Sequence, residues 1–400
     1  MKMQAFLSNG QHPEKGALPV TFPIPEQEYD RILDLLRPMG IGDAVRRDCQ
    51  LTELDTGYSA LKCLEGQAVN LDELDYLAKR LDSFDEYEAA QFEAALSKLE
   101  LSDMTDVINL TFCCQQATVI TDFSDLEKVG KAHFLTTHGG CAGTDELEAL
   151  DGYETALLLI DSGAGVVTPY GVLDDNGMKL EQVYDGTHFP EYHYNSDLLT
   201  FGLTSRSEPE GANNITWLYF PAAKGQIDRA ILRSGITDPK DMCFWNDDND
   251  LPEEINEVLD FGMEDIYALN DLTQAVEKLS QPDRVKLGAA IAMAKPQYAS
   301  QIRHLAENLD QFEFVPDVHT PKDYGKYLIQ ESGQFDYSPN LDGFYDYEGY
   351  GRRHTEEESG VFTNQGYIWY HGTLSLDELM MEDPAEEYQK EQGLEMGGMA

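Results

Sequence analysis

The sequence predicts a mixed α+β fold that is built twice within one chain of 400 residues. Short strand-like segments alternate with amphipathic helices, and the same order of segments returns after roughly 195–198 residues. A hydrophobic share of 42%, with 17 Phe and 21 Tyr, is enough to form real cores. This composition excludes a chain that is disordered throughout.

The first third of each copy is strand-like. In the first copy, residues 3–7 and 18–24 read as strands joined by a turn through Asn9-Gly10. A helix is expected over residues 26–37, because Pro38 and Gly40 would end it there.

The middle third is helical. Leucines at helical spacing predict one amphipathic helix: Leu71, Leu74, Leu77 and Leu81. Ser83 and Glu86 have the spacing of a capping box, which would open a second helix. Ser280 and Asp283 stand at the matching place of the second copy.

The last third mixes both kinds of element. Helices are expected over residues 104–112 and 126–135, a short strand over 118–120, and a strand pair within 165–173. Each copy therefore consists of three small units: a sheet with a helix, a helical unit and an α+β unit.

Collinear matches between the halves predict a tandem duplication. Leu71–Leu81 matches Leu269–Leu279, and Gly130-Lys131 matches Gly325-Lys326. A period this long indicates a duplicated domain rather than a solenoid. The expected boundaries are a first copy over 1–173, a linker over 174–196, a second copy over 197–374 and a mobile acidic tail over 375–400.

Charge is the strongest feature of the composition. The chain has 74 Asp plus Glu against 28 Lys plus Arg, a net charge of −46. Residues 1–195 contribute 35 acids and 13 bases, and residues 196–400 contribute 39 and 15, so both halves are acidic. Such a field repels nucleic acid and membrane surfaces and attracts basic ones. Solubility alone requires a net charge of magnitude about 2–8 in a small domain, which this chain exceeds several-fold. The acidic surface of a halophilic protein is the other alternative.

Two acid-rich regions are candidate target-binding surfaces. In the first copy, Glu86, Glu93 and Glu100 recur every seven residues, which places them on one helix face about 10.5 Å apart. A row on the preceding helix, opposite its leucines, and two acids near the junction complete this surface: Asp72, Asp75, Asp82 and Asp85.

In the second copy the acids concentrate where no Lys or Arg interrupts residues 241–275. The candidates are Asp247, Asp248, Asp250, Glu253, Glu254, Glu257, Asp260, Glu264 and Asp265. A solvated helix face usually alternates charge signs, because like charges at such spacing cost stability.

This charge pattern points to DNA mimicry. Duplex DNA carries one charge per about 1.7 Å, so 46 charges correspond to roughly 80 Å, or about 23 base pairs. An extended protein could present that length to a groove lined by Lys and Arg. An acidic adaptor or chaperone for basic DNA-binding proteins is the alternative from another class.

No motif supports an enzyme, a metal site or a cofactor. Six cysteines form no CxxC pair, and there is no HExxH, GxGxxG, Walker A or GxSxG sequence. Asn246, Asp248 and Asp250 resemble the start of a calcium loop, but the required Gly is absent and Pro252 intrudes. Without a signal-like N-terminus or a long apolar run, we expect a cytoplasmic protein.

One stretch near the end of the chain has a specific resemblance. Residues 323–370, DYGKYLIQESGQFDYSPNLDGFYDYEGYGRRHTEEESGVFTNQGYIWY, resemble the C-terminal signature of ArdA antirestriction proteins. Its core runs from Tyr345 to Arg352, and residues 3–24 are similar to the family's opening strands. The first copy keeps only a trace of the core, at residues 150–154, followed by the apolar run 156–160.

The resemblance implies an elongated protomer of three parts that imitates bent DNA and dimerises through its C-terminal unit. The implied partner is the methyltransferase core of type I restriction–modification enzymes, bound without a catalytic step or a cofactor; another DNA-targeting defence system is the alternative target. The residues assigned to the fold or the dimer interface are Tyr345, Asp346, Tyr347, Tyr350, Gly351 and Arg352.

Overall fold

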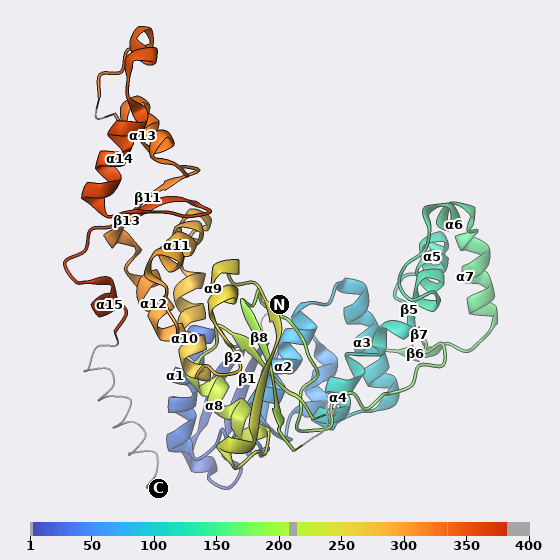
Figure 1. Cartoon of the computed structure of the whole chain (residues 1–400). Helices are drawn as coiled ribbons and strands as arrows, with labels where there is room; N and C mark the ends of the chain where they lie inside the picture. Colours follow the sequence, from blue (N-terminus) through green and yellow to red (C-terminus); the bar gives the residue numbers. More distant parts are fainter. Residues whose placement is uncertain (1–2, 208–213, 334, 382–400) are drawn as a thin grey trace. The chain divides into compact units, whose positions relative to one another are not determined.

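A computed structural model describes residues 3–207, 214–333 and 335–381 of the chain (Figure 1). They form two compact units. Unit 1 consists of Met1–Asn195, Leu203–Leu218 and Ala223–Met242, and unit 2 of Ser196–Gly202, Tyr219–Ala222 and Cys243–Ala400. Helices and small sheets occur in both units, so the predicted mixed α+β class is confirmed.

Unit 1 opens with a four-stranded sheet of order β2–β1–β3–β4, whose neighbouring strands are antiparallel. The strands are β1 (Met3–Ser8), β2 (Ala17–Phe22), β3 (Cys49–Asp55) and β4 (Ala68–Val69). Alternate residues of β1 are buried, which is the period-2 pattern the sequence shows. Helix α1 (Glu26–Leu36) follows β2, as predicted.

Three helices follow the sheet: α2 (Leu71–Asp82), α3 (Glu86–Leu99) and α4 (Met104–Leu110). The prediction of a capping box between Ser83 and Glu86 is wrong. Asp85 caps α3 instead, because its carboxylate accepts hydrogen bonds from the Tyr87 and Glu88 amides at 2.8 Å. Ser83 follows the last residue of α2 as its C-cap, and its hydroxyl donates to the Arg80 carbonyl.

The last part of unit 1 is an α+β layer. Its strands have the order β5–β7–β6, with β5 (Thr118–Ile120), β6 (Val166–Thr168) and β7 (Gly171–Asp174). Its helices are α5 (Leu126–Thr137), α6 (Thr144–Ala149) and α7 (Gly152–Asp161). Helices α5 and α7 cross closely at Gly130, where an added Cβ would overlap the Gly152 carbonyl.

The stretch 174–196, predicted as a linker, packs along unit 1. Tyr184 is 1% exposed, and its backbone exchanges hydrogen bonds of 2.7 and 3.0 Å with the side chain of Asn109. Phe189 stacks on Tyr76 with ring centroids 4.8 Å apart. These contacts bury Tyr184 and half-bury Phe189, so the stretch is not a free connection.

The remaining strands β8 (Leu199–Ser205), β9 (Thr216–Phe220) and β10 (Met242–Asn249) form a sheet of order β10–β8–β9. Helix α8 (Lys224–Arg233) belongs to unit 1. Unit 2 holds a helical part made of α9 (Glu253–Val258), α10 (Ile266–Glu277), α11 (Gln281–Ala294) and α12 (Ala299–Glu307).

Unit 2 ends in a second α+β layer. Its strand order is β11–β13–β12, with β11 (Phe312–Pro316), β12 (Val361–Phe362) and β13 (Gly366–Tyr370). Its helices are α13 (Pro321–Gln330), α14 (Tyr347–Glu358) and α15 (Leu376–Leu379). Short 3-10 helices complete the chain: η1 (Pro13–Lys15), η2 (Arg37–Met39), η3 (Ser59–Leu64), η4 (Cys114–Gln116), η5 (Pro239–Asp241), η6 (Leu309–Gln311) and η7 (Pro339–Phe344). Most of the predicted tail, residues 382–400, lies outside the described residues.

From α2 onward, corresponding elements of the two halves lie 195 residues apart, whereas β2 and β9 end 198 residues apart, at Phe22 and Phe220. The N-caps Asp85 and Ser280 open α3 and α11, and the turn hydrogen bond from Thr168 to the Gly171 carbonyl recurs at 2.8 Å from Thr363 to Gly366. The sequence match of Leu71–Leu81 with Leu269–Leu279 is three residues out of step, since α10 begins at Ile266. Three residues are nearly one helical turn, so both registers place leucines on the same face.

Candidate functional site

The acids on α3 form the first candidate surface. Glu86 and Glu100 are exposed, as is the capping residue Asp85. Glu93 is half-buried, because it accepts hydrogen bonds from the Ala60 amide at 3.0 Å and the Ser59 hydroxyl at 3.4 Å. The seven-residue row therefore presents two exposed carboxylates and one that is anchored to η3.

The expected acid row on α2 is not on the surface. Asp72 is 8% exposed and Asp75 is 5% exposed, so their assignment to an exposed target-binding face is wrong. The leucine stripe is buried as predicted, but the opposite face of α2 is covered as well. Two carboxylates that looked solvated in the sequence are instead internal.

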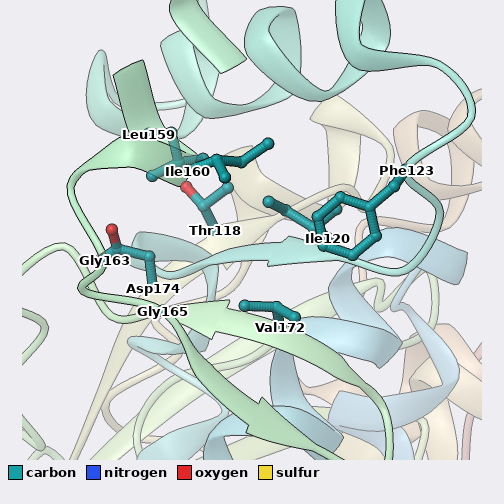
Figure 2. A pocket seen from close by; sticks show the side chains of 9 residues that line it. All are labelled: Thr118, Ile120, Phe123, Leu159, Ile160, Gly163, Gly165, Val172 and Asp174. Atoms are coloured by element: carbon teal, nitrogen blue, oxygen red, sulfur yellow. The ribbon is translucent and has the colours of Figure 1, made fainter. Parts of the chain in front are cut away.

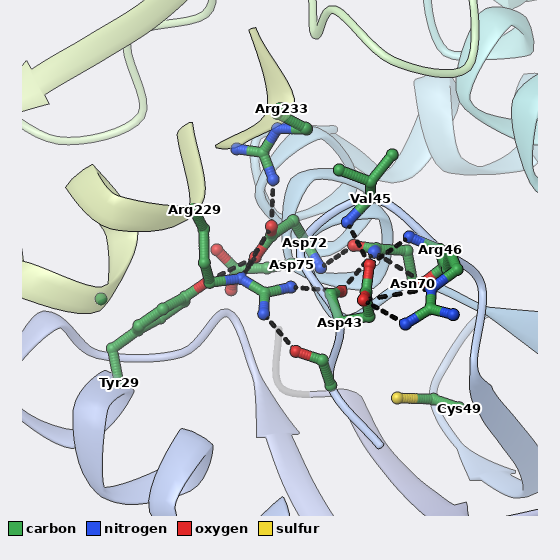
Figure 3. Close-up of polar contacts among 12 residues, drawn as sticks. Tyr29, Asp43, Val45, Arg46, Cys49, Asn70, Asp72, Asp75, Arg229 and Arg233 are labelled. Atoms are coloured by element: carbon green, nitrogen blue, oxygen red, sulfur yellow. Dashed lines mark hydrogen bonds and ion pairs between the residues drawn. The ribbon is translucent and has the colours of Figure 1, made fainter. Parts of the chain in front are cut away.

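Asp72 lies in a buried ion cluster (Figure 3). Both of its oxygens accept from Arg229 Nε, at 3.0 and 3.1 Å, and one accepts from Arg233 Nη1. The Tyr29 hydroxyl also donates to this carboxylate. The remaining Arg229 nitrogens donate to the carbonyls of Gly42 and Asp43.

The charge of Asp72 is balanced inside unit 1. Burial alone would raise the pKa of Asp72, but Arg233, Arg229 and the Tyr29 hydroxyl outweigh burial and hold the pKa below its ordinary value. This ionised carboxylate is buried and already paired with two arginines, so it is not available to bind an external target.

Asp75 and Asp82 also have internal partners. Asp75 accepts from the Ile24 amide at 2.7 Å and pairs with Lys79 at 2.9 Å. Asp82 is half-buried and accepts from the Tyr194 hydroxyl at 2.6 Å. Asp82 is thus partly accessible to solvent, whereas Asp75 is buried and stabilises the fold.

The acid-rich stretch of unit 2 is largely on the surface. It covers the end of β10, helix α9 and the N-cap of α10. The exposed members are Asp247, Asp248, Asp250, Glu253, Glu257, Asp260 and Asp265. Glu254 is half-buried beside Gln365, and Glu264 is half-buried with its carboxylate accepting from the Ala299 amide at 3.1 Å.

Crowding of like charges is visible at Glu264. Burial raises the pKa of this carboxyl, and Asp265 and Asp260 raise it further. Each neighbour makes ionisation of Glu264 less favourable. Asp260 and Asp265 are therefore close enough to Glu264 to repel its negative charge, which is consistent with a densely anionic surface.

The signature residues mostly build the fold of unit 2. Asp346 caps α14 by accepting from the Gly349 amide at 2.9 Å, and an added Cβ at Gly351 would overlap the Pro321 carbonyl on α13. Tyr347 is buried, and its hydroxyl donates to Asp342 at 2.6 Å. Arg352 is exposed and pairs with Glu348.

The two other tyrosines of the signature are half-buried. Tyr345 packs beside the Tyr347 ring at 5.8 Å, and Tyr350 meets Phe335 edge-on at 5.4 Å. Phe344, just before the core, is 87% exposed. Part of this region is thus accessible to a partner.

Sequence reasoning missed the buried partners of the acids. Glu73, on the same helix as Asp72, pairs with Arg47 at 2.6 Å and accepts from the Tyr184 hydroxyl at 3.1 Å. Arg229 is 157 residues from Asp72 in the chain. No local pattern reports a partner at that separation.

Comparison with known proteins assigns the second half of the chain. Residues 210–369 match the family model of the antirestriction protein ArdA. This segment is ArdA-like. It contains the exposed acids of α9, the crossing of α13 with α14 and the whole signature core. The match does not include residues 1–209.

No curated protein matches the chain significantly. Among the residues that the structure describes, no helix is both long and apolar enough to cross a bilayer.

Proposed function

We propose that the protein is a DNA-mimic antirestriction protein that binds the methyltransferase core of type I restriction–modification enzymes in its DNA groove. The observation that carries this proposal is the match of residues 210–369 to the antirestriction family. The net charge of −46 supports mimicry, because carboxylates can take the place of phosphates opposite Lys and Arg. On this proposal the protein is an inhibitor that needs neither a catalytic residue nor a cofactor.

Exposed acids on both units support the same function. Helix α3 with its two caps presents Asp85, Glu86 and Glu100, and the stretch 247–265 presents seven exposed carboxylates. Asp72 and Asp75 are excluded from this surface by their internal partners.

We propose also that the chain contains two ArdA-like copies. The strand orders β2–β1–β3 and β9–β8–β10 are the same, and so are β5–β7–β6 and β11–β13–β12. The close helix crossing at Gly130 recurs at Gly325, where an added Cβ would overlap the Tyr347 carbonyl. A duplication would explain why the first half repeats these details outside the family match.

A competition experiment tests the inhibitor function. Purified type I methyltransferase core, bound to a labelled target duplex, is titrated with the full chain. Displacement of the duplex and loss of restriction in cells are expected. Binding to unrelated basic DNA-binding proteins without displacement would instead support an acidic adaptor.

A matched pair of variants tests which acids matter. Asp248, Asp250, Glu253 and Glu257 are changed together to amides, and the control changes the exposed acids Asp145, Glu148, Glu154 and Asp161 of α6 and α7. At about 0.5 kcal/mol per contact the first set should lose about thirtyfold in affinity, and one change alone should be nearly silent. Equal losses from both sets would contradict a localised mimic surface.

The proposal also includes a homodimer, in which two chains associate through their C-terminal units. Phe344 and Tyr350 are suitable probes, whereas Tyr347 is buried and its hydroxyl is hydrogen-bonded to Asp342 and Gln330 of the same unit. Light scattering at several concentrations should give the mass of two chains, and Phe344→Ala with Tyr350→Ala should shift it toward one. Met263→Ala, an equally exposed apolar position, is the control. A wild-type monomer at every concentration would exclude this contact.

A further inference from the structure

Unit 1 contains a pocket between its last sheet and helix α7 (Figure 2). Its volume is about 120 Å³. The lining comes from β5, the end of α7 and β7, and is mostly apolar: Thr118, Ile120, Phe123, Leu159, Ile160, Gly163, Gly165, Val172 and Asp174.

The corresponding sheet of unit 2 has the same register. Val172 pairs with Ile120 on one side and Val167 on the other. Tyr367 pairs in the same way with Val315 and Phe362, each 195 residues further along the chain. Val172 and Tyr367 therefore occupy equivalent places in equivalent sheets.

An aromatic ring fills this place in unit 2. Tyr367 is fully buried, its ring lies 4.3 Å from that of Tyr324 between centroids, and its hydroxyl donates to Glu358 at 3.0 Å. An added Cβ at Gly360 would overlap the hydroxyl end of Tyr367. The ring thus reaches across the sheet as far as this glycine.

Unit 1 lacks the groups that fill the space. The equivalents of Tyr367, Glu358 and Tyr324 are Val172, Gly163 and Val129. At Gly165, the equivalent of Gly360, an added Cβ would lie 2.7 Å from the Cγ1 atom of Val172, where unit 2 has the ring of Tyr367. Val172 and Gly163 line the pocket, which therefore lies where unit 2 has the ring of Tyr367 and the carboxylate of Glu358.

We propose that this pocket binds a single six-membered aromatic ring, of which the tyrosine side chain is the model. An apolar cavity of about 150 Å³ takes up benzene. This pocket is of similar size, and its lining is apolar apart from Thr118 and Asp174. Phe123 and Ile160 line the pocket and are 50% and 40% exposed, which gives a ring an apolar entrance. The pocket would bind a ring whether or not the protein inhibits restriction.

Titration of the full chain with p-cresol tests the site. Saturable methyl chemical-shift changes of Ile120, Leu159 and Val172 are expected, with a rise in melting temperature at saturating p-cresol. Val172→Phe supplies the missing ring from the protein itself and should abolish the saturable changes. Val167→Phe makes the same chemical change at a position that is 82% exposed and does not line the pocket, so it should bind like the wild type.

Absence of saturable changes in the wild type would overturn the proposal, and so would undiminished binding by a folded Val172→Phe. Light scattering distinguishes the source of the ring. Self-association that p-cresol and Val172→Phe both weaken assigns the ring to a side chain of a second copy. A molar mass unaffected by either assigns the site to a free small aromatic compound.

Discussion

Asp72 has a structural role in unit 1, although its place in the sequence suggested an exposed acid that binds a target. Its carboxylate compensates two guanidinium groups within the core of unit 1, and Tyr29 adds a hydrogen bond. A buried ion pair is weak evidence for net stabilisation, but removal of one partner leaves the others without a counter-charge. The cluster should therefore be sensitive to mutation even though it takes no part in target binding.

Asp72→Asn should lower the free energy of unfolding by about 3–5 kcal/mol, because it leaves the buried Arg229 and the half-buried Arg233 beside a neutral amide. Urea denaturation measures the change. Asp34→Asn removes an exposed carboxylate that pairs with Arg37 at 3.1 Å, and should cost about 0–1 kcal/mol. Similar losses for both variants would show that the buried cluster contributes no more than a surface pair.

The pH dependence of the same comparison has a definite sign. The folded-state pKa of Asp72 is lowered, so the unfolded chain binds more protons at acidic pH. The stability contributed by Asp72 is complete above the unfolded pKa of about 3.9 and is lost as the pH falls from there through the folded value. The gap between wild type and Asp72→Asn should narrow below about pH 4. A gap that widens in acid would contradict the assigned partners.

At the scale of elements, the helix crossings depend on missing side chains. Helices α13 and α14 approach so closely that Gly325 faces the Tyr347 carbonyl, and Gly351 faces that of Pro321. The crossing of α5 with α7 repeats this with Gly130 and Gly152, while Ala156 stands where α14 has Gly351. A side chain at these positions has no space unless the helices separate.

Gly325→Ala should lower the free energy of unfolding of unit 2 by about 1–3 kcal/mol, because the added methyl group overlaps backbone rather than a movable side chain. Gly343→Ala is the control, since its added Cβ meets nothing within 4 Å and its φ is not in the left-handed region. Urea denaturation followed by tryptophan fluorescence reports the loss, because Trp369 packs near Tyr324. A neutral or stabilising Gly325→Ala would show that the crossing relaxes freely.

Local patterns predicted most elements and failed where a second layer covers them. The strand Thr118–Ile120 and the start of α5 at Leu126 were predicted correctly, because period and breakers are local signals. The acids of α2 were assigned to solvent because its leucines fill one face. That other face is covered by α8 and the stretch 174–196, which reach it from more than a hundred residues away.

The acidic surface could be predicted only in part, for the same reason. The run of acids in residues 247–265 was recognised because no basic residue interrupts it, and most of its members are exposed. The seven-residue period on α3 predicted three exposed acids, but Glu93 is half-buried against η3 and only Glu86 and Glu100 are exposed. Burial at Asp72 and Asp75 depended on Arg229 and Ile24, whose proximity only the tertiary structure reveals.

On the scale of the whole molecule, the charge of −46 is carried by both halves rather than by one tail. Such a distribution has a stability cost, because a net charge far from zero repels itself in the compact state. Added salt screens that repulsion within the protein and screens attraction to a basic partner as well. Folding and target binding should therefore respond to salt in opposite directions.

Affinity for the type I methyltransferase core should fall steeply between about 50 and 200 mM salt, since the target's Lys and Arg would be engaged as they are by phosphates. The slope of log affinity against log salt should be shallower than that of a DNA duplex, because carboxylates on a folded surface are less dense than phosphates and condense fewer counterions. Binding isotherms at several salt concentrations, with the duplex measured in parallel, give both slopes. The variant with amides at Asp248, Asp250, Glu253 and Glu257 should have a smaller slope than the wild type, and the α6–α7 control set should not. An affinity that is constant across this range would mean that the protein recognises its target by shape or apolar contact, and the carboxylates would then lose their role as substitutes for phosphate.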